Sequence, residues 1–349
     1  MGGGPGGACA ASALAGLGVS TILFEAQQEP MRKAGETLAP SAARCLQKLG
    51  MWDAFASDGH LRCHGNVSAW GQDRWQNHDF MVQGLGSAWQ LDRAVFEESL
   101  INAAARAGAT IVRGNEVTGI SRANGFWRLT SGGRTFRTGY VIDATGRRST
   151  VARKQGVRRI ILDRLVAVHG IAACGKADDN DGRTFIESCR EGWWYSALVP
   201  GQQRIVSLQT DVDLLPRPVW KTREWLLQRL GQTRHLSSLL GRHGYELTAP
   251  PRLTSARSGR LRHFGGEGWL AVGDAAMSFD PLSGRGIHNA IQSAMKAAQT
   301  LVRDRSGIRA KMECWYERLW EEFSKDRMAY YSLERRWRSA PFWQRRSSG

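Results

Sequence analysis

The feature that most constrains this chain is a glycine turn at its start. Gly2, Gly4 and Gly7 have the spacing G-x-G-x-x-G, and a run of small residues at 8–17 and an apolar run at 20–24 follow them. The first glycine permits a tight turn, the second lets the backbone approach a pyrophosphate, and the third lets a helix pack closely on a strand. Free N–H groups at the start of that helix would face the phosphates. The pattern predicts a Rossmann-type, dinucleotide-binding unit.

The next part of the pattern is an acid, and one part is missing. Glu25 follows the apolar run about 20 residues after the turn, where a carboxylate can bind ribose hydroxyls. Met1, however, stands directly before Gly2, where a buried strand of about five residues is expected. We therefore expect either that the start of the chain is truncated or that the sheet lacks its central strand. Truncation would weaken retention of the cofactor.

A second segment of nucleotide-binding character lies near the other end of the sequence. Residues 269–287 have the pattern of a strand, a glycine-rich turn and the start of a helix at about 286–302. A strand ending in Gly273-Asp274 places a carboxylate at the edge of a parallel sheet where ligands bind. Asp274 suits ribityl hydroxyls, and the helix start suits the electron-rich edge of an isoalloxazine ring. The alternative is that Asp274 only caps the helix, but paired segments at both ends of the chain favour a flavin dinucleotide.

The pattern of predicted elements changes along the chain. Alternating strands at 165–173, 192–199 and 204–210 and an amphipathic helix at about 220–240 interrupt the nucleotide-binding pattern. We expect an α/β fold: a Rossmann-type domain with a parallel sheet, and an inserted, mostly antiparallel β substrate domain. The expected boundaries are 1–60, 90–160 and 252–305 for the discontinuous FAD-binding domain, 61–89 and 161–251 for the substrate domain, and 306–349 for a C-terminal helical segment.

Composition narrows the classes of partner. The net charge of +16 attracts anions in general, but the basic residues are dispersed and no nucleic-acid-binding motif is present, so no nucleic-acid partner is expected. No run of 18 apolar residues exists, which predicts no membrane span. The six cysteines are scattered without metal-ligand spacing, which predicts no metal site and a reducing, cytoplasmic location.

Several further motifs resemble one protein superfamily. The glycine turn together with Gly-Asp-Ala-Ala…Asp-Pro-Leu-Ser-Gly-x-Gly is similar to the paired fingerprint of FAD monooxygenases, which include aromatic hydroxylases and flavin-dependent halogenases. Other motifs resemble the branch of halogenase-like flavoproteins that mature quinone-cofactor amine oxidases and dehydrogenases. These motifs are Gly35-Glu36-Thr37, Ser68-Ala69-Trp70-Gly71, Trp89-Gln90-Leu91-Asp92-Arg93, Asp143-Ala144-Thr145-Gly146-Arg147-x-Ser149 and Glu334-x-x-Trp337…Pro341-Phe342-Trp343.

The resemblance implies an FAD enzyme of aromatic-hydroxylase fold that oxygenates an aromatic side chain, in that branch a tryptophan of a partner polypeptide. It implies that Arg93 contacts the flavin or its diphosphate, and that Glu25 binds the adenosine ribose. Asp274 would hold the ribityl chain, and the backbone of Gly286 and Ile287 would face the pyrimidine carbonyl. The full set of expected cofactor-binding residues is Gly2, Gly4, Gly7, Glu25, Arg93, Gly146, Gly273, Asp274, Pro281, Gly284, Gly286 and Ile287.

Two departures from the family pattern affect the expected chemistry. Thr145-Gly146 stands where hydroxylases carry Asp-Gly, which weighs against direct use of NAD(P)H and favours reduced flavin delivered by a separate reductase. The segment 67–70 lacks the halogenase lysine, and Tyr195, Ala197 and Val199 replace the Trp-x-Trp-x-Ile-Pro signature. Halogenation is therefore disfavoured.

Three functions remain open from the sequence. A monooxygenase acting on a tryptophan-like substrate, either an aromatic small molecule or an acidic polypeptide, leads. A flavin-dependent halogenase or a geranylgeranyl-reductase-like FAD enzyme is second, and an inactive flavoprotein-like maturation or binding factor is third. Five tryptophans could wall an aromatic cleft or simply form core: Trp70, Trp75, Trp89, Trp193 and Trp194. His288 and His64 are weak candidates for an acid-base role, and no catalytic base is assigned.

Overall fold

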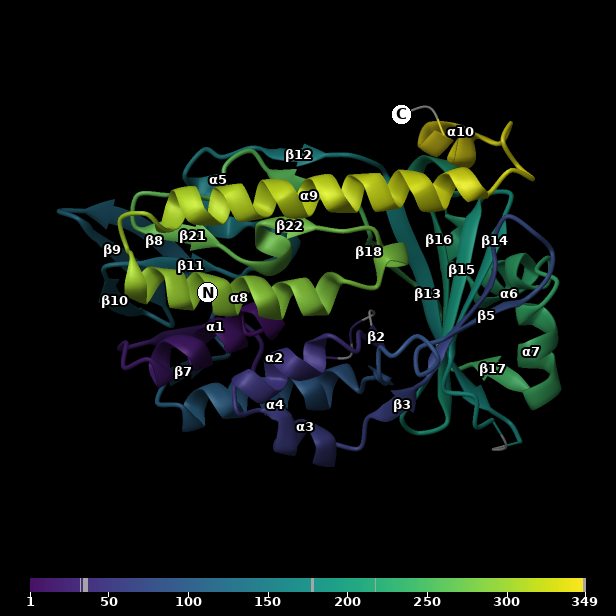
Figure 1. Cartoon of the computed structure of the whole chain (residues 1–349), viewed down its shortest axis with the longest axis horizontal. Coiled ribbons are helices and arrows are strands. Elements are labelled where there is room, and N and C mark those ends of the chain that lie inside the picture. The colour runs from purple at the N-terminus through teal and green to yellow at the C-terminus, as the bar shows by residue number, and fades with distance from the viewer. Residues whose placement is uncertain (32, 34–36, 177–178, 217, 348–349) are drawn as a thin grey trace.

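The computed structural model describes residues 1–31, 33, 37–176, 179–216 and 218–347 of the chain. Gly35 and Glu36 of the predicted Gly-Glu-Thr motif lie outside the described residues. Figure 1 shows a nucleotide-binding half with α8 at its centre beside a tall antiparallel sheet, and α9 runs above both. The α-helices are α1 (Pro5–Gly16), α2 (Ala42–Lys48), α3 (Trp52–Ser57), α4 (Arg93–Arg106), α5 (Thr150–Lys154), α6 (Arg223–Leu230), α7 (Leu236–His243), α8 (Gly286–Arg303), α9 (Ile308–Leu333) and α10 (Pro341–Ser347).

The nucleotide-binding half contains two pairs of parallel strands. β1 (Ile22–Glu25) pairs with β7 (Thr110–Arg113), and β11 (Val141–Asp143) pairs with β21 (Trp269–Ala271). Short antiparallel strands and 3-10 turns complete this half. They are β2 (Thr37–Leu38), β3 (Leu61–Cys63), β6 (Ala88–Gln90), β8 (Val117–Ala123), β9 (Phe126–Ser131), β10 (Arg134–Thr138), β12 (Arg159–Ile161), β19 (Gly259–Leu261), β20 (Gly265–Gly266), β22 (Met277–Ser278), η1 (Gly146–Arg148), η4 (Gly273–Ala275) and η5 (Pro281–Ser283).

Backbone hydrogen bonds of the first two residues join the two parallel pairs. The N–H of Gly2 donates to the carbonyl of Phe24 in β1 over 2.8 Å. On the other side, the N–H of Ala144 donates to the carbonyl of Met1 over 2.9 Å, and the amino group of Met1 donates to the carbonyl of Ile142 over 2.9 Å. Met1 and Gly2 thus lie between β1 and β11, where the sequence pattern expected a central strand.

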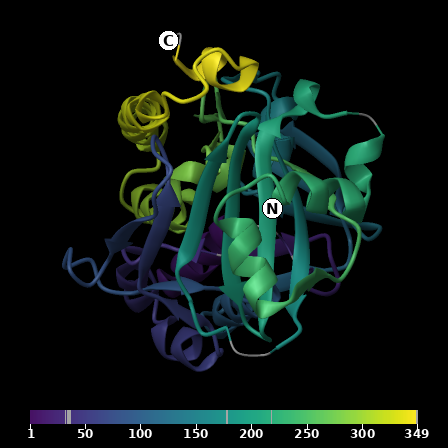
Figure 2. The same ribbon diagram turned by 90° about the vertical axis from the view of Figure 1, so that its right-hand side faces the viewer.

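The second half is one large, mostly antiparallel sheet. Its strand order is β17-β13-β16-β15-β14-β4-β5, with β18 on β13, and the predicted strands at 165–173, 192–199 and 204–210 are confirmed as β13, β15 and β16. Figure 2 shows α6 and α7 in front of one face of this sheet. The strands and associated 3-10 turns are β4 (Gly65–Ala69), β5 (Gln76–Asp79), β13 (Leu165–Cys174), β14 (Thr184–Cys189), β15 (Gly192–Val199), β16 (Gln203–Asp211), β17 (Tyr245–Leu247), β18 (Arg252–Ser255), η2 (Val212–Leu214) and η3 (Val219–Lys221).

The prediction of one amphipathic helix at 220–240 is wrong. α6 ends at Leu230, and α7 begins at Leu236. The buried carboxylate of Glu187 in β14 accepts the backbone N–H groups of Arg234 and Leu236, at 2.7 and 2.8 Å. Because the first N–H groups of a helix have no partner within it, a carboxylate at that point starts a new helix.

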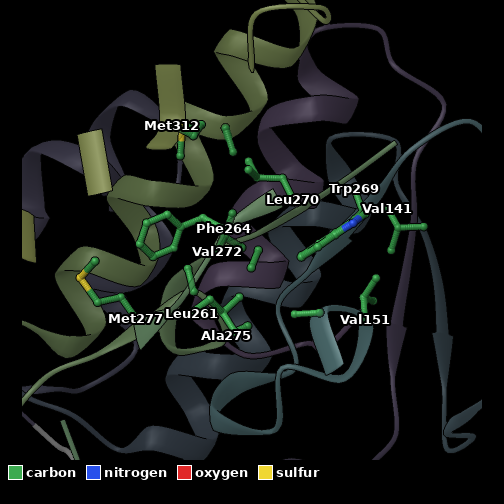
Figure 3. Packing of buried hydrophobic residues seen from close by; sticks show 14 of the residues in the cluster. Val141, Val151, Leu261, Phe264, Trp269, Leu270, Val272, Ala275, Met277 and Met312 are labelled. Carbon is green, nitrogen blue, oxygen red and sulfur yellow. The ribbon is translucent and has the colours of Figure 1, made fainter. Parts of the chain in front are cut away.

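Buried apolar side chains join the elements of each half. Around the second nucleotide segment, Phe264, Trp269 and Leu270 pack against Val272 and, from α9, Met312, all of them at most 2% exposed (Figure 3). On the outer face of the large sheet, Trp194 packs with Trp225 and Leu226 of α6. Both faces of this sheet are therefore covered, one by α6 and α7 and the other by the nucleotide-binding half and the end of α9.

A buried ion pair holds the segment at Asp179 against β16 of the large sheet. The guanidinium of Arg204, fully buried in β16, donates from Nε to Oδ2 of Asp179 over 2.6 Å, and Asp179 is 1% exposed. The Tyr245 hydroxyl donates to the same Asp179 oxygen over 2.8 Å. Removal of one partner of such a pair leaves an uncompensated charge in the interior.

We expect Arg204→Ala to lower the free energy of unfolding by about 3–5 kcal/mol, because Asp179 would stay buried without its cation. Denaturant unfolding followed by fluorescence measures this loss. Arg183→Ala is the matched control, since the Arg183 side chain is 41% exposed and its pair with Asp181 contributes at most about 1 kcal/mol. Equal losses in the two variants would contradict a stabilising role for the buried pair.

Candidate functional site

The three glycines of the turn have different surroundings. Gly2 has φ +98°, and a Cβ there would lie 2.3 Å from the carbonyl oxygen of Ala144. A Cβ on Gly7 would lie 1.7 Å from the carbonyl oxygen of Gly2, so α1 packs directly on the turn. Gly4 differs: it is the N-cap of α1, and a Cβ there would meet nothing within 4 Å. Gly2 and Gly7 are therefore required by the fold, whereas Gly4 faces open space.

Glu25 lies next to this turn at the C-terminal end of β1. Its Oε2 accepts the N–H of Gly3 over 2.6 Å, and its Oε1 accepts the N–H of Gln27 over 2.8 Å. The two bonds fix the carboxylate beside the start of α1. This is the place at which the sequence pattern put a ribose-binding acid.

The second nucleotide segment lies on the neighbouring strand pair. Gly273 has φ +58° and approaches α8, where a Cβ would be 3.1 Å from the Cβ of Ala290. The Asp274 side chain is 35% exposed, and its Oδ2 lies 3.2 Å from Nε of Arg147. Gly146, with φ +62°, ends the turn after β11 and faces open space. Because β11 and β21 are parallel neighbours, their C-terminal ends bring Gly146 and Asp274 to one edge of the sheet.

Arg159 supports this edge and was missed by the sequence reasoning. Its guanidinium donates to the carbonyl of Asp274 over 3.0 Å, to Oγ of Ser278 over 2.7 Å and to the carbonyl of Gly259 over 3.0 Å. Burial lowers the pKa of the Arg159 guanidinium to about 10. No local motif marks this arginine, since apart from Ser149 its partners lie at least a hundred residues later in the chain.

The turn before α8 exposes backbone. Pro281 is exposed, Gly284 has φ +60°, and neither Gly284 nor Gly286 would place a Cβ within 4 Å of another atom. Gly286 begins α8, and the side chain of its N-cap residue, Arg285, accepts no hydrogen bond from the first N–H groups of the helix. Ile287 follows and is half-buried. The first N–H groups of this 18-residue helix are therefore open to a ligand.

The two histidine candidates lie in different surroundings. His288 is half-buried in the first turn of α8, and its Nδ1 lies 3.3 Å from the hydroxyl of Ser41. Burial, with a smaller contribution from the charge of Arg285, lowers the pKa of His288, so the ring is neutral at neutral pH and can accept a proton. His64 is exposed between β3 and β4.

A cleft of about 160 Å³ separates the start of α4 from the large sheet. Arg93, the first residue of α4, bonds to Glu97, and Nζ of Lys33 lies 2.5 Å from the same carboxylate. On the opposite wall, Nε2 of His169 in β13 lies 3.0 Å from Oγ1 of Thr254. The residues lining the cleft are Lys33, Leu91, Asp92, Arg93, His169, Gly170, Ile171, Val199, Pro200, Gln203, Ile205, Thr248, Ala249, Pro250 and Arg252.

Of the two alternatives for the five tryptophans, the structure supports core packing rather than the wall of one cleft. Trp193 and Trp194 are both 1% exposed, and because side chains alternate along a strand they pack into cores on opposite faces of β15. Trp70 shares the cluster of Trp193, Trp75 packs against that of Trp194, and Trp89 packs against a third cluster. Trp70, Trp193 and Trp194 are core residues, and Trp75 and Trp89 are partly buried at the edges of cores.

A buried polar network joins the two halves and was also missed. The hydroxyl of Thr37 in β2 lies 2.8 Å from the hydroxyl of Tyr195 in β15 and donates to Gln90 over 2.9 Å. Nε2 of Gln90 donates to the hydroxyl of Thr184 in β14 over 2.8 Å. Through these bonds Tyr195 and Thr184 connect β2 and β6 to the large sheet.

Taken together, the exposed backbone fits a dinucleotide. Gly4, Gly146, Gly284 and Gly286 would all direct a Cβ into open space, and Glu25 and Asp274 lie at the ends of β1 and β21. The helix starts of α1 and α8 supply further N–H groups that no side chain caps among the described residues. A parallel sheet with these features defines the class of nucleotide-binding flavoproteins.

Comparison with known proteins identifies the family. Residues 1–311 match the family described as FAD binding domain. The chain is 30% identical over 356 residues to "Putative FAD-dependent oxidoreductase LodB" of Marinomonas mediterranea, covering 99% of this chain and 95% of that protein. The chain therefore belongs to the FAD-binding domain family, and it is an FAD-dependent oxidoreductase. The predicted Rossmann-type fold and FAD cofactor are confirmed.

Solved structures share the whole fold. The crystal structure of CmlS, a flavin-dependent halogenase, has a TM-score of 0.85 and 25% identity, covering 99% of this chain and 66% of that one. The peptidyl tryptophan dihydroxylase QhpG, essential for tryptophylquinone cofactor biogenesis, has a TM-score of 0.80 and 23% identity, covering 99% and 77%. Within the described part of the chain, no helix is long and apolar enough to cross a bilayer.

Gly4→Val tests the glycine turn without disturbing the fold. Its φ of −67° suits any residue and its Cβ meets no atom, so we expect the unfolding free energy to stay within about 1 kcal/mol of the parent. FAD affinity should fall more than about tenfold, because the new side chain fills the space that a diphosphate would enter. Titration of apoprotein with FAD, followed by flavin fluorescence, measures this.

Gly16→Val, at the other end of α1 and equally open, is the matched control and should bind FAD normally. Equal FAD affinities of the Gly4 and Gly16 variants would rule out Gly4 as a diphosphate contact.

Proposed function

We propose that this oxidoreductase is a monooxygenase that adds oxygen to a tryptophan-like aromatic ring, with a partner polypeptide as the preferred substrate. The observation that carries the proposal is the position of the cleft. It lies between Arg93 of the nucleotide-binding half and the face of the large sheet at His169 and Ile205. A ring held there would face the cofactor rather than solvent. The likeness to a peptidyl tryptophan dihydroxylase supports the substrate class.

We infer the following division of roles at the cofactor. Gly2, Gly4 and Gly7 take the diphosphate at the start of α1, and Glu25 binds the adenosine ribose. Gly146, Gly273 and Asp274 hold the ribityl chain, Arg93 contacts the flavin or its diphosphate, and Pro281, Gly284, Gly286 and Ile287 face the pyrimidine end. FAD supplies the oxygen-activating redox chemistry when it is bound and reduced. The protein binds and orients it and excludes water from the cleft.

A base within this arrangement would come from α8. Of the two histidines, His288 is favoured because it is half-buried, neutral at neutral pH and part of the helix turn that would face the flavin. His64 is exposed in a loop and would be in solvent. Because Nδ1 of His288 faces Ser41, Nε2 is the ring nitrogen that would exchange a proton with the site.

The rim of the cleft fits an acidic polypeptide. Three cations, Lys33, Arg93 and Arg252, line the cleft, and Asp92 is the acidic residue among its lining residues; Glu97 pairs with both Lys33 and Arg93. Asp92 is engaged in capping α4, where it accepts the N–H groups of Ala94 and Val95. Complementary charge between two binding partners raises their association rate and helps to fix their relative orientation.

The electron donor is proposed from the turn after β11. The hydroxyl of Thr145 donates to Asp143 over 2.6 Å, and its backbone N–H donates to the same oxygen over 3.1 Å. Thr145 therefore stabilises the turn through Asp143, and the turn has no carboxylate at the position where hydroxylases carry an aspartate. This supports reduced flavin delivered by a separate reductase over direct reduction by NAD(P)H. Free cysteines at all six positions support a reducing, cytoplasmic location.

Halogenation is the second candidate, favoured by the match to CmlS over nearly the whole chain. Two observations weigh against it. β4 carries no lysine, and the Tyr195 hydroxyl is bonded to Thr37. A saturating reductase and a non-catalytic maturation factor are the remaining alternatives, and product analysis separates them.

We expect oxygen to be incorporated when the purified protein is incubated with a reductase-supplied reduced flavin, O2, chloride and tryptophan-containing peptides of acidic or basic sequence. Mass spectrometry should find the gain of oxygen on tryptophan, greater for the acidic peptide than for the basic one. Gain of chlorine would instead establish a halogenase, and gain of two hydrogens a reductase. FAD-loaded protein that modifies none of the peptides or free indoles would favour a binding factor. Gly4→Val protein, which should bind FAD weakly, is the control for oxidation by free reduced flavin and O2 in solution.

A further inference from the structure

A buried carboxylate lies in the segment that would face the flavin. Asp280 is 1% exposed and directly precedes η5 and α8. Its Oδ1 accepts the N–H of Leu282 over 3.0 Å, and its carbonyl accepts the hydroxyl of Ser283 over 2.8 Å. We call residues 280–286 the flavin loop. The conformation of this loop therefore depends on how Asp280 is held.

The second oxygen of Asp280 is held by α9. The hydroxyl of Tyr331 donates to Oδ2 over 2.9 Å and accepts the indole N–H of Trp193 over 3.1 Å. Nε of Arg327 lies 3.4 Å from the same oxygen. A continuous chain of hydrogen bonds thus runs from β15 of the large sheet, through α9, into the flavin loop.

Tyr331 is itself fixed by an aromatic cluster that includes the C-terminal motif. Its ring lies 5.7 Å from Trp70, 5.9 Å from Trp343 and 6.2 Å from Phe342, centroid to centroid. Nε1 of Trp343 donates to the carbonyl of Cys189 over 2.9 Å. Together with Trp193 these residues form what we call the aromatic clamp: Trp70, Trp193, Tyr331, Phe342 and Trp343.

Glu334 fixes the end of α9 to the same sheet. It is 3% exposed, and its Oε2 accepts the N–H of Gly71 over 2.8 Å and the hydroxyl of Ser188 over 2.7 Å. The residues of the motif Glu334…Pro341-Phe342-Trp343 thus fix the position of Tyr331. All of these C-terminal residues lie beyond residue 311, outside the part of the chain that matches the FAD-binding family.

Packing alone does not require the Tyr331 hydroxyl. A phenylalanine would fill the same apolar space, and burying a hydroxyl and a carboxylate together costs desolvation energy that their mutual bond only offsets. The bond acts on a loop whose backbone, at Gly284 and Gly286, is open to the cofactor. This location distinguishes it from a bond that merely stabilises the core.

We propose that Tyr331 is a positioning residue for FAD: its hydroxyl holds Asp280, and the aromatic clamp thereby places the flavin loop for the pyrimidine end of the cofactor. The inference rests on FAD binding by this loop, and it makes the C-terminal segment part of the cofactor site. It does not depend on which substrate is oxidised.

The charge of the loop gives a second readout. Burial raises the pKa of Asp280, and the groups that face it from the packed elements are Arg327, Arg346 and Tyr331 of the C-terminal helices and Asp163. Burial and the Asp280 charge raise the pKa of Tyr331, so its hydroxyl stays protonated and donates to the carboxylate. Without this donor the pKa of Asp280 rises further. Protonation of Asp280, and any loss of FAD affinity that follows, then occurs at higher pH.

Tyr331→Phe and Tyr330→Phe form a matched pair on adjacent positions of α9, since the Tyr330 side chain is 56% exposed. We expect Tyr331→Phe to raise the FAD dissociation constant about tenfold, to change the visible absorption spectrum of bound flavin, and to shift the acid-side decline of affinity to higher pH. Tyr330→Phe should stay within about twofold of the parent in affinity and leave the spectrum unchanged. Thermal unfolding of both apoproteins confirms that they are folded.

A double-mutant cycle with Asp280→Asn tests the route. If Tyr331 acts through Asp280, Tyr331→Phe changes the dissociation constant less than about twofold in the Asp280→Asn background. Unchanged FAD affinity, spectrum and pH dependence in Tyr331→Phe, or fully additive losses, would overturn the proposal. Should Tyr331→Phe not fold, Asp280→Asn alone decides: normal FAD affinity and spectrum in that variant overturn it. Since FAD binding is measured without substrate, a failed oxygenation assay leaves this test intact.

Discussion

The structure depends on one close backbone contact, in which Gly2 lies against Ala144 and Gly7 against Gly2. A Cβ on Gly2 or Gly7 would overlap a carbonyl oxygen, so a side chain at either position separates α1 from the strands. The hydrogen bonds of Met1 and Gly2 join β1 and β7 to β11 and β21 at the same place. Two parts of the chain that lie more than a hundred residues apart thereby share one sheet edge, and the cofactor elements lie along it.

Local patterns predicted much of this edge, because each motif carries its own geometry. The helix expected at 286–302 is α8, Gly286–Arg303, and the strand ending at Gly273-Asp274 is followed by the expected turn. Glu25 could be placed beside the glycine turn because strand, helix and turn are consecutive in the sequence. The residues that bind FAD stay a prediction, since the structure shows where they lie and not what they hold.

Contacts between distant segments could not be predicted in this way. The break between α6 and α7 depends on Glu187, which lies about fifty residues earlier in β14. Trp193 and Trp194 are adjacent in β15 and face opposite sides of the sheet, and the sequence did not show that both sides are packed against other elements. The same holds for the bonds of Arg159, for the network around Tyr195 and for the bond from Tyr331 to Asp280. Each joins residues far apart in the sequence, and local hydrophobic periodicity does not show which distant segments will meet.

Side chains cap some of the helix starts in this fold and leave others uncapped. Asp143 accepts the N–H groups of Val151 and Ala152 and so satisfies α5, and Asp92 does the same for α4. Among the described residues, no side chain caps α1 or α8, whose first residues follow Gly4 and Arg285. Within the described ranges, α2, α3 and α9 also lack a capping side chain, so what distinguishes α1 and α8 is the open space that glycines leave beside their first turns. The two helix starts at the cofactor edge keep their N–H groups and positive dipole ends, which a neutral or cationic ligand could not use as well as a dinucleotide can.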